Sequence, residues 1–244
     1  MPVDPPHPDI RFGPIRHALT SMAPEPVDPP WAPEHRQTAA VAVVLRSARD
    51  LDVLLIKRAT SERDPWSGQM ALPGGRRDAA DTSLRHTAIR ETHEEVGLDL
   101  GLHARPYLGR MDALLPGTKR LPIDSITPFV FGVHGRADAV VASHEVADIF
   151  WIPLIELADP ASRSTVKIPL PEGPRSFPCY RVAGQVIWGL THRILSQFLV
   201  IHAASADLPA PRAFRPHERL DSDPLEDDRD GPQPLQRQPK PRPR

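Results

Sequence analysis

Residues Pro73 to Leu98 read PGGRRDAADTSLRHTAIRETHEEVGL, and the interpretation of the chain starts from this stretch. It opens with a glycine pair, which tolerates positive φ and lets a ligand come close to the backbone. From Asp81 to Glu95 there is no glycine or proline, and Gly97 stands just beyond. Any of the three polar residues 81–83 could cap the start of a helix there. The stretch therefore predicts a turn followed by a helix of about four turns.

Three glutamates gather near the end of this predicted helix. At 100° per residue, Glu91, Glu94 and Glu95 fall within a sector about 100° wide, beside an apolar sector that would face the core. Clustered carboxylates repel one another unless cations compensate them, and Mg²⁺ or Mn²⁺ prefers such oxygen ligands. An ion held there would favour attack by water on phosphorus. The alternative is a solvated acidic face, in which Arg90 pairs with Glu94.

The surrounding sequence predicts a mixed α/β domain. Apolar runs at 39–46 and 52–58 indicate buried strands, and 69–72 forms a short apolar piece before the glycine pair. Further strands are expected at 106–114, 123–134, 146–152, 177–182 and 185–188, with a helical turn at 153–158. Residues 189–204 have the apolar spacing of a closing amphipathic helix. Strands mixed with two principal helices predict a layered α/β sandwich.

Proline marks the two ends of the chain. Ten of the 31 prolines lie in residues 1–33 and nine in 205–244, and such stretches cannot continue helices or central strands. We therefore expect a partly ordered leader at 1–35 with a short helix at 15–22, one domain at 36–204, and a disordered tail at 205–244.

Charge and cysteine content exclude several classes of function. A net charge of −1 provides no positive field for nucleic acid or an anionic membrane. Cys179 is the only cysteine, which excludes an internal disulfide and a zinc site built from paired cysteines. The start MPVDPPHPDIRF is unlike a secretory signal, and no apolar run is long enough to cross a membrane. A cytoplasmic protein is expected, and whether it forms a homodimer stays open.

The stretch resembles the Nudix box, written as Gly, five residues, Glu, seven residues, Arg-Glu-apolar-x-Glu-Glu-x-Gly-apolar. The matching positions are Gly75, Arg90, Glu91, Glu94, Glu95, Gly97 and Leu98. The resemblance implies a Nudix-type α/β/α sandwich with a mixed central sheet. It also implies that the three glutamates bind Mg²⁺ or Mn²⁺, that Arg90 orients them, and that Gly75 bends the loop against the metal. Two departures are Asp81 in place of the first Glu, with eight residues before Arg90, and Thr92 at an apolar position.

Other segments are similar to the coenzyme A pyrophosphatase branch of that family. The upstream signature is represented by residues 54–59, Gly68 and residues 72–75, but Leu72 replaces an aromatic residue and Asp64, beside Arg63, replaces an arginine. Residues 187–191 also resemble this branch. The resemblance implies hydrolysis of coenzyme A or a derivative to 3′,5′-ADP and 4′-phosphopantetheine. Hydrolysis of ADP-ribose, a nucleotide sugar or a nucleoside triphosphate, and a non-catalytic binding module, are the alternatives.

Further site residues complete the expected active site. Guanidinium groups match phosphate oxygens in a bidentate manner, so the candidate substrate-phosphate contacts are Arg58, Arg63, Arg76 and Arg77 with the backbone of Gly74 and Gly75. The expected catalytic residues are Glu94, Glu95, Arg90 and Glu145, the last as a further ligand or the general base. A zincin-type site at His93 is excluded because the second histidine position is Gly97.

Overall fold

The central strand of the fold is β1 (Thr38–Ser47), in a computed structural model that describes residues 9–22, 38–61, 66–102, 106–116, 123–134, 139–170 and 173–207. Along one edge, β1 pairs in parallel with the whole of β6 (Ser125–His134). Along its other edge it pairs antiparallel with β2 (Leu51–Arg58) at one end and with β4 (Gly74–Arg76) at the other. The sheet is therefore mixed, as the resemblance implied.

The remaining strands of this sheet extend it on both sides. β5 (Tyr107–Arg110) pairs with β6, and β7 (Val146–Pro153) pairs with the outer edge of β2. β3 (Met70–Ala71) pairs with the edge of β2 that faces β1, at Ile56 and Lys57, beyond the residues of β2 that pair with β1. Seven strands form the sheet in the described part of the chain.

The link between β3 and β4 lies where β1 and β2 separate. The Pro73 carbonyl accepts a hydrogen bond from the Ala42 amide at 2.8 Å, so this link is fixed to β1. Gly74 has φ 149°, and a Cβ there would lie 2.6 Å from the Val41 Cα. Only glycine fits this position, which explains the first half of the glycine pair.

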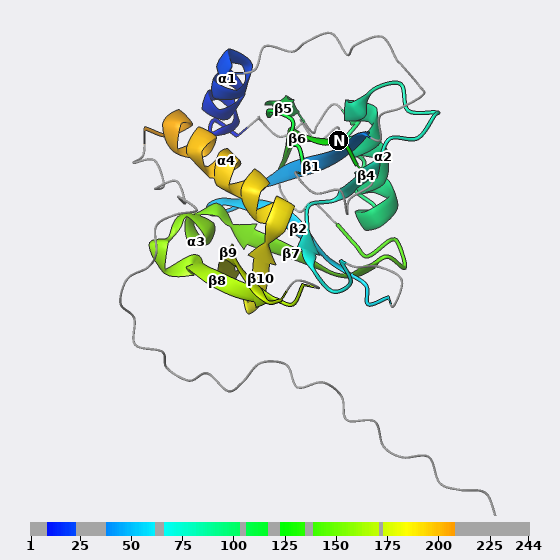
Figure 1. The fold of residues 1–244 in the computed structure, drawn as a ribbon. Helices are drawn as coiled ribbons and strands as arrows, with labels where there is room; N and C mark the ends of the chain where they lie inside the picture. Colours follow the sequence, from blue (N-terminus) through cyan, green and yellow to red (C-terminus); the bar gives the residue numbers. More distant parts are fainter. Residues whose placement is uncertain are drawn as a thin grey trace, which may run out of the picture. The chain divides into compact units, whose positions relative to one another are not determined.

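Helices cover both faces of the sheet (Figure 1). Ala39, Val43 and Leu45 of β1 pack in a core cluster together with α1 (Phe12–Met22) and α4 (Gly189–Ser205). The alternate residues Ala40, Ala42 and Val44 pack in a second cluster with α2 (Leu84–Val96). Because successive side chains of a strand point to opposite faces, these are the two sides of an α/β/α sandwich. The expected fold class is confirmed.

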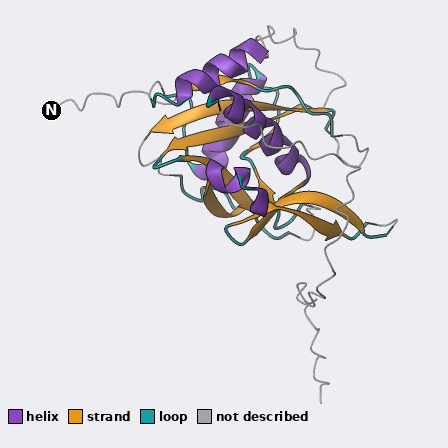
Figure 2. Cartoon of the chain, turned by 90° about the vertical axis from the view of Figure 1, so that its left-hand side faces the viewer, coloured by secondary structure: helices purple, strands orange, loops and turns teal. Residues whose placement is uncertain are grey.

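A second, smaller sheet follows along the chain. β7 leads into α3 (Leu154–Ala158) and a 3₁₀ turn at Pro160–Ser162, and then β8 (Arg163–Ile168), β9 (Arg175–Val182) and β10 (Gln185–Trp188) form an antiparallel sheet. Figure 2 shows its strands below the helices. The Thr191 hydroxyl of α4 donates to the Met70 carbonyl of β3 at 3.1 Å. The start of α4 is thereby tied to the strand that precedes the glycine pair.

Most elements lie close to the predicted ranges, but four features differ. The glycine pair was predicted to form a turn, whereas it lies in the short strand β4, which pairs with β1. β8 was not predicted, and its half-buried pattern shows why: it carries no continuous apolar run. The strand expected at 106–114 is only four residues long, followed by an isolated pairing of Leu114 with Ile126. The helix expected at 15–22 begins at Phe12.

Helix α1 supplies core side chains although it lies before residue 36. Phe12, Ile15 and Leu19 are almost fully buried, and a Cβ at Gly132 or Gly109 would collide with Phe12 or Leu19. The close packing of α1 on β5 and β6 therefore relies on two glycines. The 205–244 tail beyond Asp207 and most of the 1–35 leader lie outside the described residues. Within the described ranges, no helix is long and apolar enough to cross a membrane.

Candidate active site on helix α2

Both ends of α2 are capped by residues of the stretch 73–98. The Ser83 hydroxyl accepts a hydrogen bond from the His86 amide at 3.1 Å, so Ser83 is the N-cap among the three candidates at 81–83. At the other end, Gly97 has φ 67° and its amide donates to the His93 carbonyl at 2.9 Å. This left-handed cap favours glycine. The local sequence thus determines where the helix carrying the glutamates begins and ends.

Asp81 is a buried acceptor rather than a cap. Its carboxylate accepts hydrogen bonds from Arg90 Nε at 2.9 Å, from the Thr87 hydroxyl at 2.8 Å and from the Asp78 amide at 2.9 Å. Burial alone would raise the pKa of Asp81, but the hydrogen bonds led by Arg90 lower it to about 2. Asp81 is therefore ionised at neutral pH, and its carboxylate fixes the position of the Arg90 guanidinium.

Arg90 connects this buried acid to two of the glutamates. Its terminal nitrogens lie 3.0 Å from a carboxylate oxygen of Glu91 and 3.0 Å from one of Glu94, and it also donates to the Arg76 carbonyl at 3.2 Å. The hydrogen bond with Asp81 is the main reason that the pKa of Arg90 is raised. The guanidinium is thus fixed between the loop and the helix, where its rotation is restricted.

Glu95 is the most enclosed of the three glutamates. Glu95 is only 5% exposed, and one of its carboxylate oxygens accepts a hydrogen bond from the Gly74 amide at 2.9 Å. The pKa of Glu95 is raised to about 8, mainly by burial; the Gly74 hydrogen bond and the charge of Arg58 lower it, and the charges of Glu91 and Glu145 add to the increase. The side chain is a carboxylate that needs a cation to stay ionised at neutral pH.

Glu91 lies against the second glycine of the pair. Burial raises its pKa, and the charge of Arg90 opposes this effect. A Cβ at Gly75 would lie 2.5 Å from the Glu91 Cδ, so the absence of a side chain at Gly75 makes room for this carboxylate. Gly74 therefore binds Glu95 through its amide, while Gly75 accommodates Glu91.

Glu94 is placed differently from its two neighbours. Its side chain is 56% exposed and directed to Arg90. Among the described residues, no three acidic, histidine or cysteine side chains lie close enough together to bind one ion as they stand. The pair that faces the glycine loop consists of Glu91 and Glu95.

The four arginines predicted to contact substrate phosphate differ in where the structure places them. Arg58 ends β2 and is near enough to Glu95 to lower its pKa. Arg76 is exposed, whereas Arg77 donates to the Asp81 carbonyl at 3.0 Å and so supports the turn before the helix. Arg63 lies outside the described residues. The structure thus brings Arg58 to the carboxylate pair from a different strand.

Glu145 lies near Glu95 because residues 139–145, which were not predicted to contact α2, pack against the end of that helix. The Val140 and Ala142 amides donate to the Val96 and Glu95 carbonyls at 3.0 and 3.1 Å, which satisfies two carbonyls at the end of α2. The Glu145 carbonyl then accepts the Ala59 amide at 2.7 Å. No local signal in residues 139–145 indicates this docking, because it is a backbone contact between distant segments.

The donor chemistry of this site fits a hard divalent cation. Glu91 and Glu95 offer carboxylate oxygens at the glycine loop, and burial disfavours the ionised form of both. Mg²⁺ is commonly bound by one or two carboxylates together with water and substrate phosphates. Two partly enclosed carboxylates match that requirement.

Comparison with known proteins agrees with this geometry. A model of the NUDIX domain matches residues 35–170. A Nudix hydrolase, NudL, of Pectobacterium atrosepticum is 32% identical over 179 residues, which cover 69% of this chain and 85% of that protein. An uncharacterized protein of Schizosaccharomyces pombe is 32% identical over 156 residues, covering 57% of this chain and 47% of its own length.

A further relative carries a substrate in its name. The peroxisomal coenzyme A diphosphatase of Mus musculus is 30% identical over 119 residues, covering 47% of this chain and 45% of that protein. The chain thus spans about half the length of the yeast and mouse relatives that it matches. Since the family model covers more than half of the chain and ends beyond both the glycine loop and α2, this chain belongs to the NUDIX domain family.

Proposed function

We propose that this protein hydrolyses the diphosphate linkage of a small molecule, with Mg²⁺ or Mn²⁺ bound by Glu91 and Glu95 and with Glu94 completing the site. The single observation that carries this proposal is the enclosure of Glu95 against the Gly74 amide, where burial outweighs the charge of Arg58 and raises the pKa of the carboxyl group to about 8. A carboxylate in that state is suited to bind a cation rather than to stabilise the fold.

Gly74, Asp81 and Arg90 position the three glutamates. Gly74 orients Glu95, Asp81 holds Arg90, and Arg90 holds Glu91 and Glu94. This arrangement keeps the carboxylates in place before substrate arrives, so little reorganisation is needed during the reaction. A bound divalent ion would lower the pKa of a water molecule bound to it and would neutralise negative charge on the phosphoryl oxygens.

Two further groups are assigned to the substrate and the attacking water. Arg58, with Arg76 and the glycine backbone, is proposed to contact phosphate oxygens, and Arg63 is proposed for the same role from the sequence alone. Glu145 lies near enough to influence Glu95 electrostatically. It is proposed either to bind the ion or to accept the proton of water.

Coenzyme A or a derivative is the proposed substrate. The signature in residues 54–75 and the similarity at 187–191 support it, as does the likeness to a mouse protein named coenzyme A diphosphatase. The predicted products are 3′,5′-ADP and 4′-phosphopantetheine. Hydrolysis of ADP-ribose or a nucleotide sugar is the alternative that the same carboxylate site would support.

The test is a substrate panel with product analysis. Coenzyme A, ADP-ribose and a nucleotide sugar are incubated with Mg²⁺ or Mn²⁺ and the wild type, Glu95→Gln, or the exposed control Glu156→Gln. We expect coenzyme A to be cleaved fastest and Glu95→Gln to lower kcat by about 100-fold or more, while Glu156→Gln matches the wild type. A preference for ADP-ribose would overturn the assignment of coenzyme A as the substrate. An absence of metal-dependent turnover of all three compounds would favour a non-catalytic binding module.

A further inference from the structure

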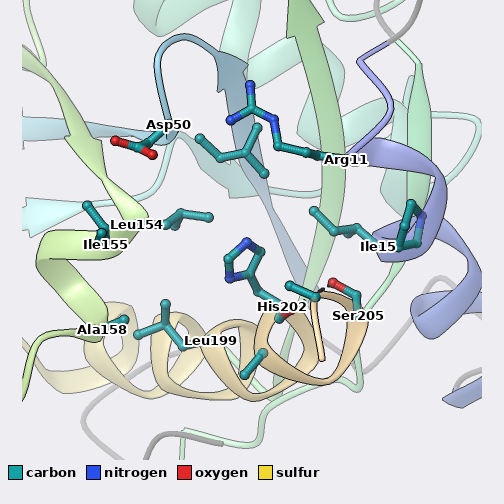
Figure 3. Close-up of a pocket in the computed structure, with 13 residues that line it drawn as sticks. Arg11, Ile15, Asp50, Leu154, Ile155, Ala158, Leu199, His202 and Ser205 are labelled. Atoms are coloured by element: carbon teal, nitrogen blue, oxygen red, sulfur yellow. Dashed lines mark hydrogen bonds between the residues drawn. The ribbon is translucent and has the colours of Figure 1, made fainter. Parts of the chain in front are cut away.

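A cavity of about 380 Å³ lies between four elements on the side of the sheet that carries α1 and α4 (Figure 3). Its apolar wall comes from Ile15 of α1, Leu51 of β2, Leu154 of α3, and Leu199 and Ala203 of α4. These five side chains are at least 95% buried. The floor of the cavity is therefore formed by core residues, and its opening is lined by the exposed residues Pro14, Asp50, Ile155 and Ala206.

This cavity is separate from the glutamate site. Ile15, Leu51, Leu154 and Leu199 belong to the core cluster on one face of the sheet, whereas α2 covers the other face. Along β1, Leu51 pairs with Ser47 and Gly75 pairs with Ala40. Seven residues of strand correspond to roughly 23 Å, so one diphosphate bound at Gly75 would not reach the cavity.

Of the two charges at the rim of the cavity, Arg11 is already compensated and Asp50 is exposed to solvent. Arg11 Nη2 lies 2.6 Å from an Asp9 oxygen, and Arg11 Nε lies 2.9 Å from the other. Arg11 also donates to the Ala48 carbonyl at 3.1 Å. Asp50 lies on the other side of the opening (Figure 3). An anion would meet Asp50 and a guanidinium that is already paired, and a cation would meet only the solvent-screened charge of the exposed Asp50, so neither sign of charge is strongly favoured.

The imidazole of His202 faces the cavity without a hydrogen bond from the described residues. The His202 ring projects from α4 into the space between Ile15 and Leu154 (Figure 3) and stacks on Phe198 with a centroid distance of 6.3 Å. Within the described residues, nothing hydrogen-bonds to either of its ring nitrogens. Burial, together with the charge of Arg11, lowers its pKa. A neutral imidazole offers one N–H donor and one acceptor nitrogen.

We propose that this cavity is a second binding site, which takes a small uncharged molecule with an apolar body and one hydroxyl or amide group that hydrogen-bonds to His202. Clefts that are lined mainly by apolar side chains with a few polar groups are typical small-molecule sites, and this volume lies within their range. The hydroxyl or amide is required because it can hydrogen-bond to the imidazole nitrogen that faces the cavity, which a hydrocarbon would leave without a partner. This inference does not depend on the proposed diphosphatase activity.

The first experiment follows the full chain by NMR while 1-hexanol, hexanoate or hexylamine is added. These three probes share an apolar body and differ in the charge of the polar group. We expect saturable shifts at the cavity residues with 1-hexanol and a Kd at least tenfold tighter than that of either charged probe. Equal binding of the three probes, or an absence of saturable shifts at the cavity, would overturn the proposal.

Variants on α4 then locate the site. Ala203→Leu fills the cavity and should abolish 1-hexanol binding, whereas Ala204→Leu, on the exposed side of the same helix, should bind as the wild type does. His202→Phe keeps a ring but removes the hydrogen bond, so the Kd should rise about fivefold. If Ala203→Leu does not fold, Ala158→Leu fills the same cavity from α3. Unchanged binding by the filled variant, or by His202→Phe, would refute the assignment.

Discussion

The pKa of Glu95 predicts an unusual dependence of stability on pH in the metal-free protein. In the unfolded chain this carboxyl titrates near 4.5, and in the folded protein burial raises its pKa to about 8. Because the folded state binds the proton more tightly, the contribution of Glu95 to stability is fully present below pH 4.5. It is lost as pH rises through about 8. The difference between the two pKa values corresponds to at most about 5 kcal/mol.

Replacing Glu95 by Gln isolates this effect. Glutamine keeps an oxygen that can accept the Gly74 amide but has no proton to lose. We therefore expect the free energy of unfolding of the metal-free wild type to fall by a few kcal/mol between pH 5 and pH 8, relative to Glu95→Gln. Added Mg²⁺ should restore the wild type at pH 8 and leave Glu95→Gln unchanged, because binding to the folded state alone stabilises it.

The assay is urea unfolding followed by circular dichroism, at several pH values with EDTA or with Mg²⁺. Glu94→Gln is the matched control, since its carboxylate stands on the same helix with a side chain that is 56% exposed, and it should keep the wild-type slope. Parallel pH profiles for the wild type and Glu95→Gln would refute the argument. That result would mean that Glu95 is already ionised in the metal-free fold.

Two other substitutions test the support around the site. Asp81→Asn removes the buried charge opposite Arg90 and should lower the free energy of unfolding by about 3 kcal/mol, measured by urea unfolding at pH 7; a loss below 0.5 kcal/mol would contradict the importance of that pair. Gly75→Ala places a methyl group within 2.5 Å of the Glu91 Cδ, so affinity for Mn²⁺ should fall at least tenfold in a titration. Gly13→Ala, where nothing lies within 4 Å of the added Cβ, should retain the affinity of the wild type, and equal affinity for both variants would show that Glu91 can move aside.

Some features of this protein follow from short stretches of sequence. Helix α2 lies between Ser83 and Gly97 because capping and backbone preference act over a few residues. The strands β1 and β10 were predicted closely, since a short apolar or alternating run between turn residues is a local signal. The same reasoning predicted the presence of carboxylates on one helix, but not that the glycine pair would lie in a strand, β4.

Other features were decided only when distant segments packed together. The sequence did not indicate that the Gly74 amide would bind Glu95 or that Asp81 would be a buried partner of Arg90. The pairing of Arg90 with an exposed Glu94 is the alternative that the sequence offered for this residue. The sequence also did not indicate that residues 139–145 would dock on the end of α2, or that α1 would join the core. Each of these contacts depends on the crossing of strands and helices in space, and hydrophobic periodicity contains no information about which surfaces will meet. Local preference therefore determined the elements and the residue types of the site, while tertiary packing determined which carboxylates are buried and where the cavity beside His202 lies.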